Sequence, residues 1–162
     1  MTEYILTSKE MSIADELTIK SGISSKKLML QAGTSVFKNL PTNGNAKALV
    51  VCGPGNNGGD GYVVGKHLFD IGNEVNIYCP LSDKAETDDN IFYKNKIDKN
   101  CFVKSVEDIS SYDFIVDALF GTGLSRELSY EIIKFIERVN NSLVDIYAID
   151  IPSGINGNTS EI

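Results

Sequence analysis

The stretch "GPGNNGGDGY", residues 53–62, decides which fold this sequence can adopt. It contains five glycines and follows the apolar run "ALVVC" (residues 48–52), which is typical of a buried strand. The next residues, "VVGKHLF" (63–69), have the pattern of a helix. We therefore expect a strand, a glycine-rich loop and a helix that begins near Asp60. Such a unit points backbone N–H groups at an anion, most simply a phosphate.

Strands and helices alternate along the rest of the chain. Two helices are expected first, one opened by the capping-box pair Thr7 and Glu10 and ended by Gly22, the other opened by Ser24 or Ser25. We expect strands at residues 47–52, 75–79, 114–119 and 144–149, and helices at about 60–69, 88–97 and 129–139. Connections of this length join parallel strands. The sequence thus predicts a doubly wound, Rossmann-like, mostly parallel α/β sheet with helices on both faces, preceded by the N-terminal helices.

Composition narrows the class of protein. The 162 residues suffice for one domain, and the net charge of −7 argues against nucleic acid as a partner. The apolar runs are too short for a membrane span, and the N-terminus lacks the layout of a signal peptide. The three cysteines form no CxxC pair, so we expect free thiols and a cytoplasmic protein.

The glycine-rich stretch formally matches two known phosphate motifs. Gly53, Gly55 and Gly58 have the spacing of the dinucleotide fingerprint, but the second strand does not end in the acid that would hold the ribose. A P-loop is excluded because Gly59-Asp60 stands where Gly-Lys-Ser/Thr is needed. Two interpretations remain for the polar residues of "NNGGDG": they form turns, or they contact a ligand.

Two later loops repeat the pattern of an acid followed by glycines and short polar residues. Asp117 lies near the end of the third expected strand, before Gly121-Thr122-Gly123, and Asp150 ends the fourth, before Pro152-Ser153-Gly154. Parallel strands end at one edge of the sheet, so we expect the three loops to meet there. Asp117 is either a turn acceptor or a cation ligand. Asn57, Asp117 and Ser153 together offer hard oxygen ligands with one formal charge, which suits a large monovalent cation.

Other polar side chains have simpler interpretations. Lys66 and Arg126 are possible phosphate partners, although solvation at the surface explains both. His67, the only histidine, falls inside an expected helix, where we expect a structural role. The sequence offers no Ser/His/Asp set among neighbouring residues and no Cys/His metal cluster.

Four segments resemble one known family, the NAD(P)H-hydrate epimerases with the YjeF N-terminal domain. They are "GPGNNGGDGYVVGKHL" (53–68), "VDALFGTGLSREL" (116–128), "IDIPSGINGNT" (149–159) and the opening "LTSKEMSIADELTIKSGISSKKLMLQAG" (6–33). The resemblance implies a repair enzyme that interconverts the R and S hydrates of NADH and NADPH, which carry a hydroxyl at C6 of the nicotinamide ring. A separate dehydratase then restores the cofactor from the S form.

The resemblance also implies the site residues. One K⁺ per subunit would be bound by Asn57, Asp117 and Ser153. The residues implied for substrate binding are Asn56, Asn57, Gly58, Gly59, Asp60, Gly121, Thr122, Gly123, Leu124, Ser125, Arg126, Glu127 and Asp150. Epimerisation needs a carboxyl group to protonate the departing hydroxyl and to activate the returning water. Our first candidate is Asp150, which is not an expected K⁺ ligand, and our second is Asp60.

Family members commonly continue for several tens of residues beyond the third motif and commonly form dimers. We therefore expect that residues 1–162 form one domain that lacks the family's C-terminal strands, with a fused dehydratase domain and a homodimer both possible. Two other functions stay open: a non-catalytic nucleotide-binding or scaffold module, and an NAD(P) oxidoreductase. The intact "NNGGDG" and "DIPSG" motifs argue against the first, and the missing ribose-binding acid argues against the second.

Overall fold

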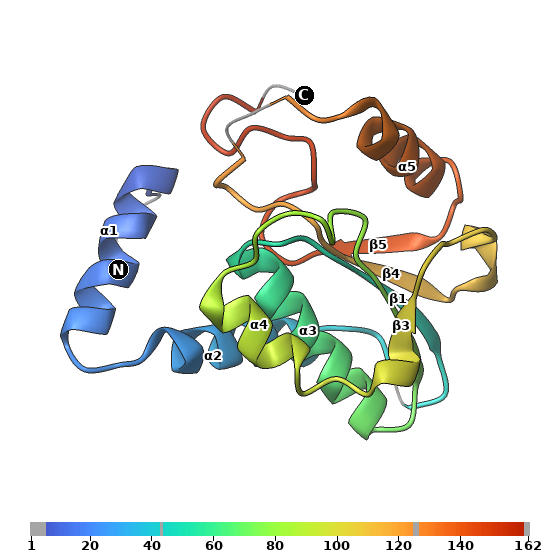
Figure 1. The fold of residues 1–162 in the computed structure, drawn as a ribbon, viewed down its shortest axis with the longest axis horizontal. Coiled ribbons are helices and arrows are strands. Elements are labelled where there is room, and N and C mark those ends of the chain that lie inside the picture. The colour runs from blue at the N-terminus through green and yellow to red at the C-terminus, as the bar shows by residue number, and fades with distance from the viewer. Residues whose placement is uncertain (1–5, 43, 125–126, 161–162) are drawn as a thin grey trace.

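A five-stranded parallel sheet organises the chain, with strand order β3-β2-β1-β4-β5 (Figure 1). The computed structural model describes residues 6–42, 44–124 and 127–160. The strands are β1 (Lys47–Cys52), β2 (Glu74–Tyr78), β3 (Phe102–Val103), β4 (Phe114–Ala118) and β5 (Asp145–Ala148). The helices are α1 (Ser8–Lys20), α2 (Ser25–Phe37), α3 (Asn56–Asp70), α4 (Asp88–Lys94) and α5 (Tyr130–Asn140), with 3₁₀ turns at Lys99–Cys101 and Ile109–Ser111.

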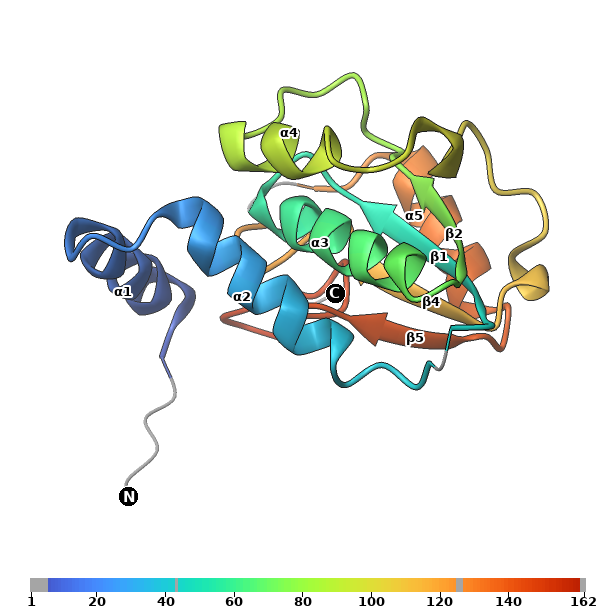
Figure 2. The same ribbon diagram turned by 90° about the horizontal axis from the view of Figure 1, so that it is seen from below.

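Helices cover both faces of the sheet, which confirms the doubly wound α/β class. Alternate residues of β1 enter two separate cores, as the period of a strand requires. Ala48 and Val50 pack with α2, α3 and α4, whereas Leu49 and Val51 pack with α5. Figures 1 and 2 show α5 on one side of the sheet and α2, α3 and α4 on the opposite side.

The strand order reverses between β1 and β4, and this reversal positions the site. From β1 the chain moves outward to β2 and β3, then returns to place β4 on the other side of β1. In open parallel sheets, ligands bind outside the carboxyl ends of the strands at such a switch point. The loops after β1, β4 and β5 are the three that the sequence singles out.

The helix after β1 begins earlier than expected. We expected a loop up to Asp60, but α3 begins at Asn56, so that "NNGGDG" forms its first turns. The reason is packing. A Cβ on Gly58 would lie 1.9 Å from the carbonyl oxygen of Gly53, and one on Gly61 would lie 2.5 Å from the Cβ of Ala118. The missing side chains let α3 approach β1 and β4 closely, and this outweighs the low helix propensity of glycine.

Smaller differences concern element ends. The two-residue strand β3 is absent from the expected elements, and α4 stops at Lys94 rather than near residue 97. β4 ends at Ala118, one residue early, and β5 ends at Ala148, so Asp150 lies two residues beyond its strand rather than at its end.

The N-terminal helices form as the caps predict. Thr7 and Glu10 make a reciprocal capping box at α1, and Ser24 caps α2. His67 stacks on Phe37 with ring centroids 5.0 Å apart, and its Nε2 is 2.9 Å from the hydroxyl of Thr34. These contacts join α2 to α3, which agrees with a structural role for the histidine.

The side chains of Cys52, Cys79 and Cys101 are free thiols, as expected. In the part of the chain that the structure describes, no helix is both long and apolar enough to cross a membrane.

Candidate functional site

Three strand-end segments meet at the carboxyl edge of the sheet: the first turn of α3, the loop after β4 and the loop after β5. Several hydrogen bonds join them, and two of these define the centre of the site. The Nδ2 of Asn57 donates to the carbonyl oxygen of Phe120 at 2.8 Å, and the N–H of Thr122 donates to Oδ2 of Asp150 at 2.7 Å. Gly121 lies where all three meet, because a Cβ there would be 2.6 Å from Oδ2 of Asp150 and 3.5 Å from the Cβ of Asn57. We call this the carboxyl-edge site.

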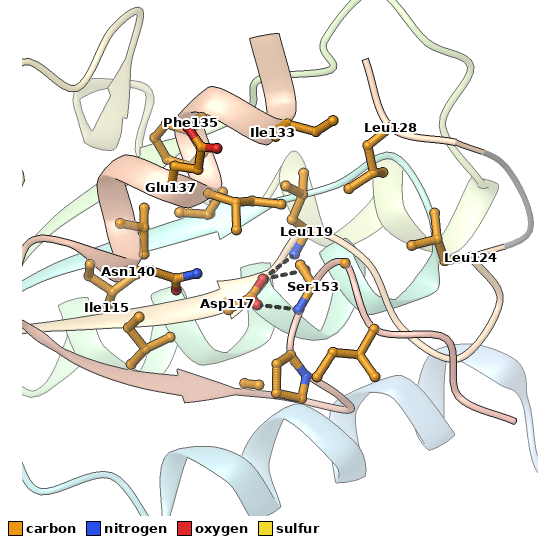
Figure 3. Close-up of a pocket in the computed structure, with 18 of the residues that line it drawn as sticks. Ile115, Asp117, Leu119, Leu124, Leu128, Ile133, Phe135, Glu137, Asn140 and Ser153 are labelled. Atoms are coloured by element: carbon orange, nitrogen blue, oxygen red, sulfur yellow. Dashed lines mark hydrogen bonds between the residues drawn. The ribbon is translucent and has the colours of Figure 1, made fainter. Parts of the chain in front are cut away.

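The residues expected to bind a cation lie together in this site. Asp117 accepts hydrogen bonds from the hydroxyl of Ser153 (2.6 Å), the N–H of Ser153 (2.8 Å) and the N–H of Leu119 (3.2 Å) (Figure 3). The main chain of Phe120 links this pair to Asn57: its N–H donates to the hydroxyl of Ser153 at 2.9 Å, and its carbonyl accepts from Asn57.

Two features fit a monovalent cation at this point. The Oδ1 atom of Asn57 is buried and has no hydrogen-bond partner within residues 6–42, 44–124 and 127–160, and a buried acceptor of this kind needs a compensating group. Asp117 is partly buried, all of its hydrogen bonds given above come from neutral donors, and no described lysine or arginine forms an ion pair with it. The amide, hydroxyl and carbonyl oxygens present are hard ligands of low total charge.

Divalent metal ions are usually bound by several acidic, histidine or cysteine side chains. The described residues contain no group of three or more His, Cys, Asp or Glu side chains able to hold a metal. The donor set at Asn57, Asp117 and Ser153 therefore suits K⁺ better than Mg²⁺ or Zn²⁺.

Two carboxyl groups of the site, Asp60 in α3 and Asp150 in the loop after β5, differ in environment. Burial, followed by the charges of Asp150 and Asp15, raises the pKa of Asp60 from 3.8 to about 7. A carboxyl group with a pKa near neutrality can both give and take a proton at physiological pH. Asp150 is exposed and accepts the Thr122 N–H. The site therefore contains one carboxyl group with a raised pKa and one that is exposed to solvent.

The first turn of α3 supplies positive potential to the same place. Its N-cap is Gly55, which offers no side-chain acceptor to the free N–H groups of the first turn. A 15-residue helix also carries a partial positive charge at this end. An anionic group of a ligand is stabilised there by backbone dipoles, although the chain as a whole is acidic.

An apolar cavity of about 1020 Å³ lies on the α5 side of the sheet, next to the Asp117–Ser153 pair (Figure 3). Asp117, Ser153, Leu124 and Glu127 lie in its wall, together with apolar residues of α5, β4 and β5. Asp60 and Asp150 do not line it. The cavity thus shares Asp117, Ser153 and parts of the loops after β4 and β5 with the carboxyl-edge site, but it is not lined by Asn57.

The other residues expected to bind substrate or phosphate differ in burial and in position. Gly58 and Gly59 are buried and pack against the backbone of Gly53 and the side chain of Met29. The N–H of Gly59 donates to the carbonyl oxygen of Gly55 at 3.3 Å and is therefore not available to a ligand. Gly123 has open space around it. Ser125 and Arg126 lie outside the described residues. Lys66 forms an ion pair with Asp70 on the exposed surface of α3, which does not support its expected role as a phosphate partner.

Sequence reasoning missed the main chain of Phe120 and the carboxylate of Asp15. Phe120 acts through backbone atoms, which leave no trace in residue type. Its place between Asp117 and Gly121 was the available signal. Asp15 comes from α1, far away in sequence, and its proximity to Asp60 depends on tertiary structure.

Comparison with known proteins assigns the chain to a family. Residues 25–162 match the family model described as "YjeF-related protein N-terminus". The chain belongs to this family. A solved yeast protein, YNL200c, has the same fold, with a TM-score of 0.78 and 24% sequence identity over 99% of this chain and 75% of that one.

Two curated relatives align with nearly all of the chain. The NAD(P)H-hydrate epimerase of Oenococcus oeni is 38% identical over 100% of this chain and 80% of its own length. The bifunctional NAD(P)H-hydrate repair enzyme Nnr of Thermofilum pendens is 36% identical over 94% of this chain, which spans only 32% of that protein. The motifs of the carboxyl-edge site thus occur in a chain whose named relatives repair hydrated nicotinamide nucleotides.

Proposed function

We propose that this chain interconverts the R and S hydrates of NADH and NADPH. The observation that carries the proposal is the pair Asp60 and Asp150, placed beside a helix N-terminus able to hold a phosphate-bearing ligand. The names of the relatives indicate the same reaction. The enzyme is then an isomerase.

The reaction requires a hydroxyl to leave one face of the nicotinamide ring and water to add to the other. Asp60, which holds its proton near neutral pH, gives that proton to the departing hydroxyl, so water leaves. The lone pair of the ring nitrogen stabilises the cation that remains on the ring. A water molecule then adds to the opposite face and passes a proton to the carboxylate of Asp150. The reverse direction uses the same groups in exchanged roles.

A K⁺ ion, one per subunit, is the second part of the proposal. Asn57, Asp117 and Ser153 would hold it, with the carbonyl of Phe120 beside them. A bound K⁺ would supply positive charge next to an anionic substrate. The residues themselves order the loops after β4 and β5, because the Asp117–Ser153 contacts join them directly.

K⁺ is expected to raise the melting temperature of the wild-type chain, because a ligand that binds only the folded state stabilises it. With K⁺ at about 100 times its Kd the gain is about 2.7 kcal/mol. Asn57→Ala should lose most of this gain, since it removes the buried Oδ1. Thermal unfolding in KCl and in choline chloride measures the difference. Asn39 is an exposed residue just after α2, so Asn39→Ala is the matched control. The melting temperature of this variant should respond to K⁺ as that of the wild type does. An identical response in Asn57→Ala would contradict the site.

The reaction itself is tested by supplying the R hydrate together with an S-specific dehydratase, with and without K⁺. We expect the chain to accelerate NADH or NADPH recovery well above the rate of spontaneous epimerisation, and more so in K⁺. Nucleotide binding without acceleration would support the scaffold alternative instead. Hydride transfer to a second substrate would support an oxidoreductase.

The partners and location follow as parts of the same proposal. The S hydrate needs a dehydratase to consume it, and the bifunctional relatives suggest that the two activities belong together. Free thiols fit a reducing cytoplasm.

Helix α1 offers a surface that a second copy of the chain could cover. It has no buried residue, and its side chains Met11, Ile13 and Leu17 are 45%, 47% and 61% exposed. Sedimentation equilibrium distinguishes that dimer from a monomer.

A further inference from the structure

The turn that begins α3 is held from behind by the segment that begins α4. Three successive carbonyl groups of the turn accept hydrogen bonds from two residues of this segment. Asn90 Nδ2 donates to the carbonyl oxygens of Gly53 (3.0 Å) and Gly55 (2.8 Å), and the N–H of Thr87 donates to that of Pro54 (3.2 Å).

This arrangement fixes the direction of the peptide dipoles. In a trans peptide the C=O and the following N–H point in opposite directions, and the described chain contains no cis peptide. Because the carbonyls of Pro54 and Gly55 point at α4, the N–H groups of Gly55 and Asn56 point away from it. Successive N–H groups with one orientation form an anion-binding concavity.

The hydroxyl of Thr87 also orients a side chain of the site. It accepts the N–H of Asn90 as the N-cap of α4 (3.4 Å) and donates its proton to Oδ1 of Asn56 (2.9 Å). With its oxygen occupied in this way, the amide of Asn56 has its two N–H donors left for a ligand. Asn56 is exposed, so those donors are accessible.

Asn90 is an unusual residue to keep in a core. It is 0% exposed, and its Oδ1 has no hydrogen-bond partner among the residues that the structure describes. A buried amide with one unsatisfied atom destabilises the fold relative to an apolar side chain of similar size. The two hydrogen bonds from its Nδ2 to the turn give a reason for its presence.

We propose that Thr87 and Asn90 are positioning residues for substrate binding. They hold the Gly53–Asn56 turn with its N–H groups turned outward and present the amide donors of Asn56 to hydrogen-bond acceptors of a phosphate-bearing nucleotide. This rests on the proposed function for the identity of the substrate. The two residues act through Asn56 and the turn, and they take no part in proton transfer.

Thr87→Val tests the proposal, since valine keeps the shape of threonine and removes the hydroxyl. We expect KM for the hydrate, and Kd for NADP⁺ as an unreactive nucleotide probe, to rise about fivefold to tenfold, with kcat changed by less than about twofold. Thr87→Ser should restore both constants. In an Asn56→Ala background, Thr87→Val should change Kd by less than about twofold, because the two side chains act together.

Ser24→Ala is the matched control, because it removes the N-cap of α2 without touching the turn. It should reduce stability about as much as Thr87→Val and leave KM and Kd unchanged. The proposal is wrong if Thr87→Val shows the same pattern as Ser24→Ala, or if Thr87→Ser fails to restore binding. Absence of epimer exchange in the wild type would refute the reaction alone, since the NADP⁺ binding measurements would still test the positioning role.

Discussion

Replacing Asp60 with asparagine is expected to slow epimer exchange by about a hundredfold or more and, above pH 7, to stabilise the fold. The loss of activity follows from the removal of a general acid, a contribution of about 10² to 10⁴ in rate. In the wild type, the rate should fall as the pH rises through about 7, because the protonated form of Asp60 is the active one. Asp60→Asn should lose this pH dependence.

The stabilisation follows from the same raised pKa. Asp60 has a folded pKa of about 7 and an ordinary value of 3.8, so between these the folded protein keeps a proton that the unfolded chain releases. The contribution of Asp60 to the free energy of unfolding therefore falls as the pH rises from about 4 to about 7. The full difference corresponds to about 4 kcal/mol, and the partial exposure of the carboxyl group reduces it to about 2 kcal/mol.

Chemical denaturation at pH 4 and pH 8 measures this effect. Asp60→Asn should match wild type at pH 4 and exceed it by about 2 kcal/mol at pH 8. Asp70→Asn, at the exposed end of the same helix, is the control and should change stability by less than about 0.5 kcal/mol at either pH. A variant that is no more stable than wild type at pH 8 would show that Asp60 is not held protonated by its surroundings.

Replacing Asp150 with asparagine is the second large change. We expect a loss of epimer exchange of about 10² to 10⁴, because the amide cannot accept the proton of the returning water. The amide oxygen can still accept the Thr122 N–H, so the loop after β5 should keep its position. Asp145→Asn, at the exposed start of β5, is the control and should retain wild-type activity.

Asp150→Asn has a further consequence for Asp60. The charge of Asp150 contributes to the raised pKa of Asp60, after burial, and its removal should lower that pKa. Carboxyl ¹³C NMR titration of Asp60 in both proteins measures the change. Near-normal turnover in folded Asp150→Asn, together with an unchanged titration of Asp60, would exclude the acid–base pair.

The alternation of apolar strands and capped helices made the fold predictable. The capping box at Thr7 formed as expected, and each β-branched run formed a strand, although the ends of β2, β4 and β5 differ from the expected ones by one residue. The start of α3 was not predictable in this way. The glycines at its start indicate a loop by propensity, whereas the close approach of Gly58 to Gly53 and of Gly61 to Ala118 appears only when the helix packs on the sheet.

The candidate site was also predictable only in part. Because parallel strands end at one edge, the meeting of Asn57, Asp117 and Ser153 could be expected from sequence order alone. The positioning contacts could not. No motif of the sequence singles out Thr87 or Asn90, and their hydrogen bonds to Asn56 and to the turn depend on how α4 packs against α3.

Oxygen exchange with the solvent tests the central claim most directly, namely that paired carboxyl groups remove a hydroxyl and let water return on the other face. The R hydrate is incubated with the chain and K⁺ in H₂¹⁸O, and the S hydrate is analysed by mass spectrometry against a protein-free control. We predict that S hydrate forms above the spontaneous rate and carries ¹⁸O, and that neither Asp60→Asn nor Asp150→Asn supports this. S hydrate formed at an accelerated rate with its original oxygen retained would contradict the account.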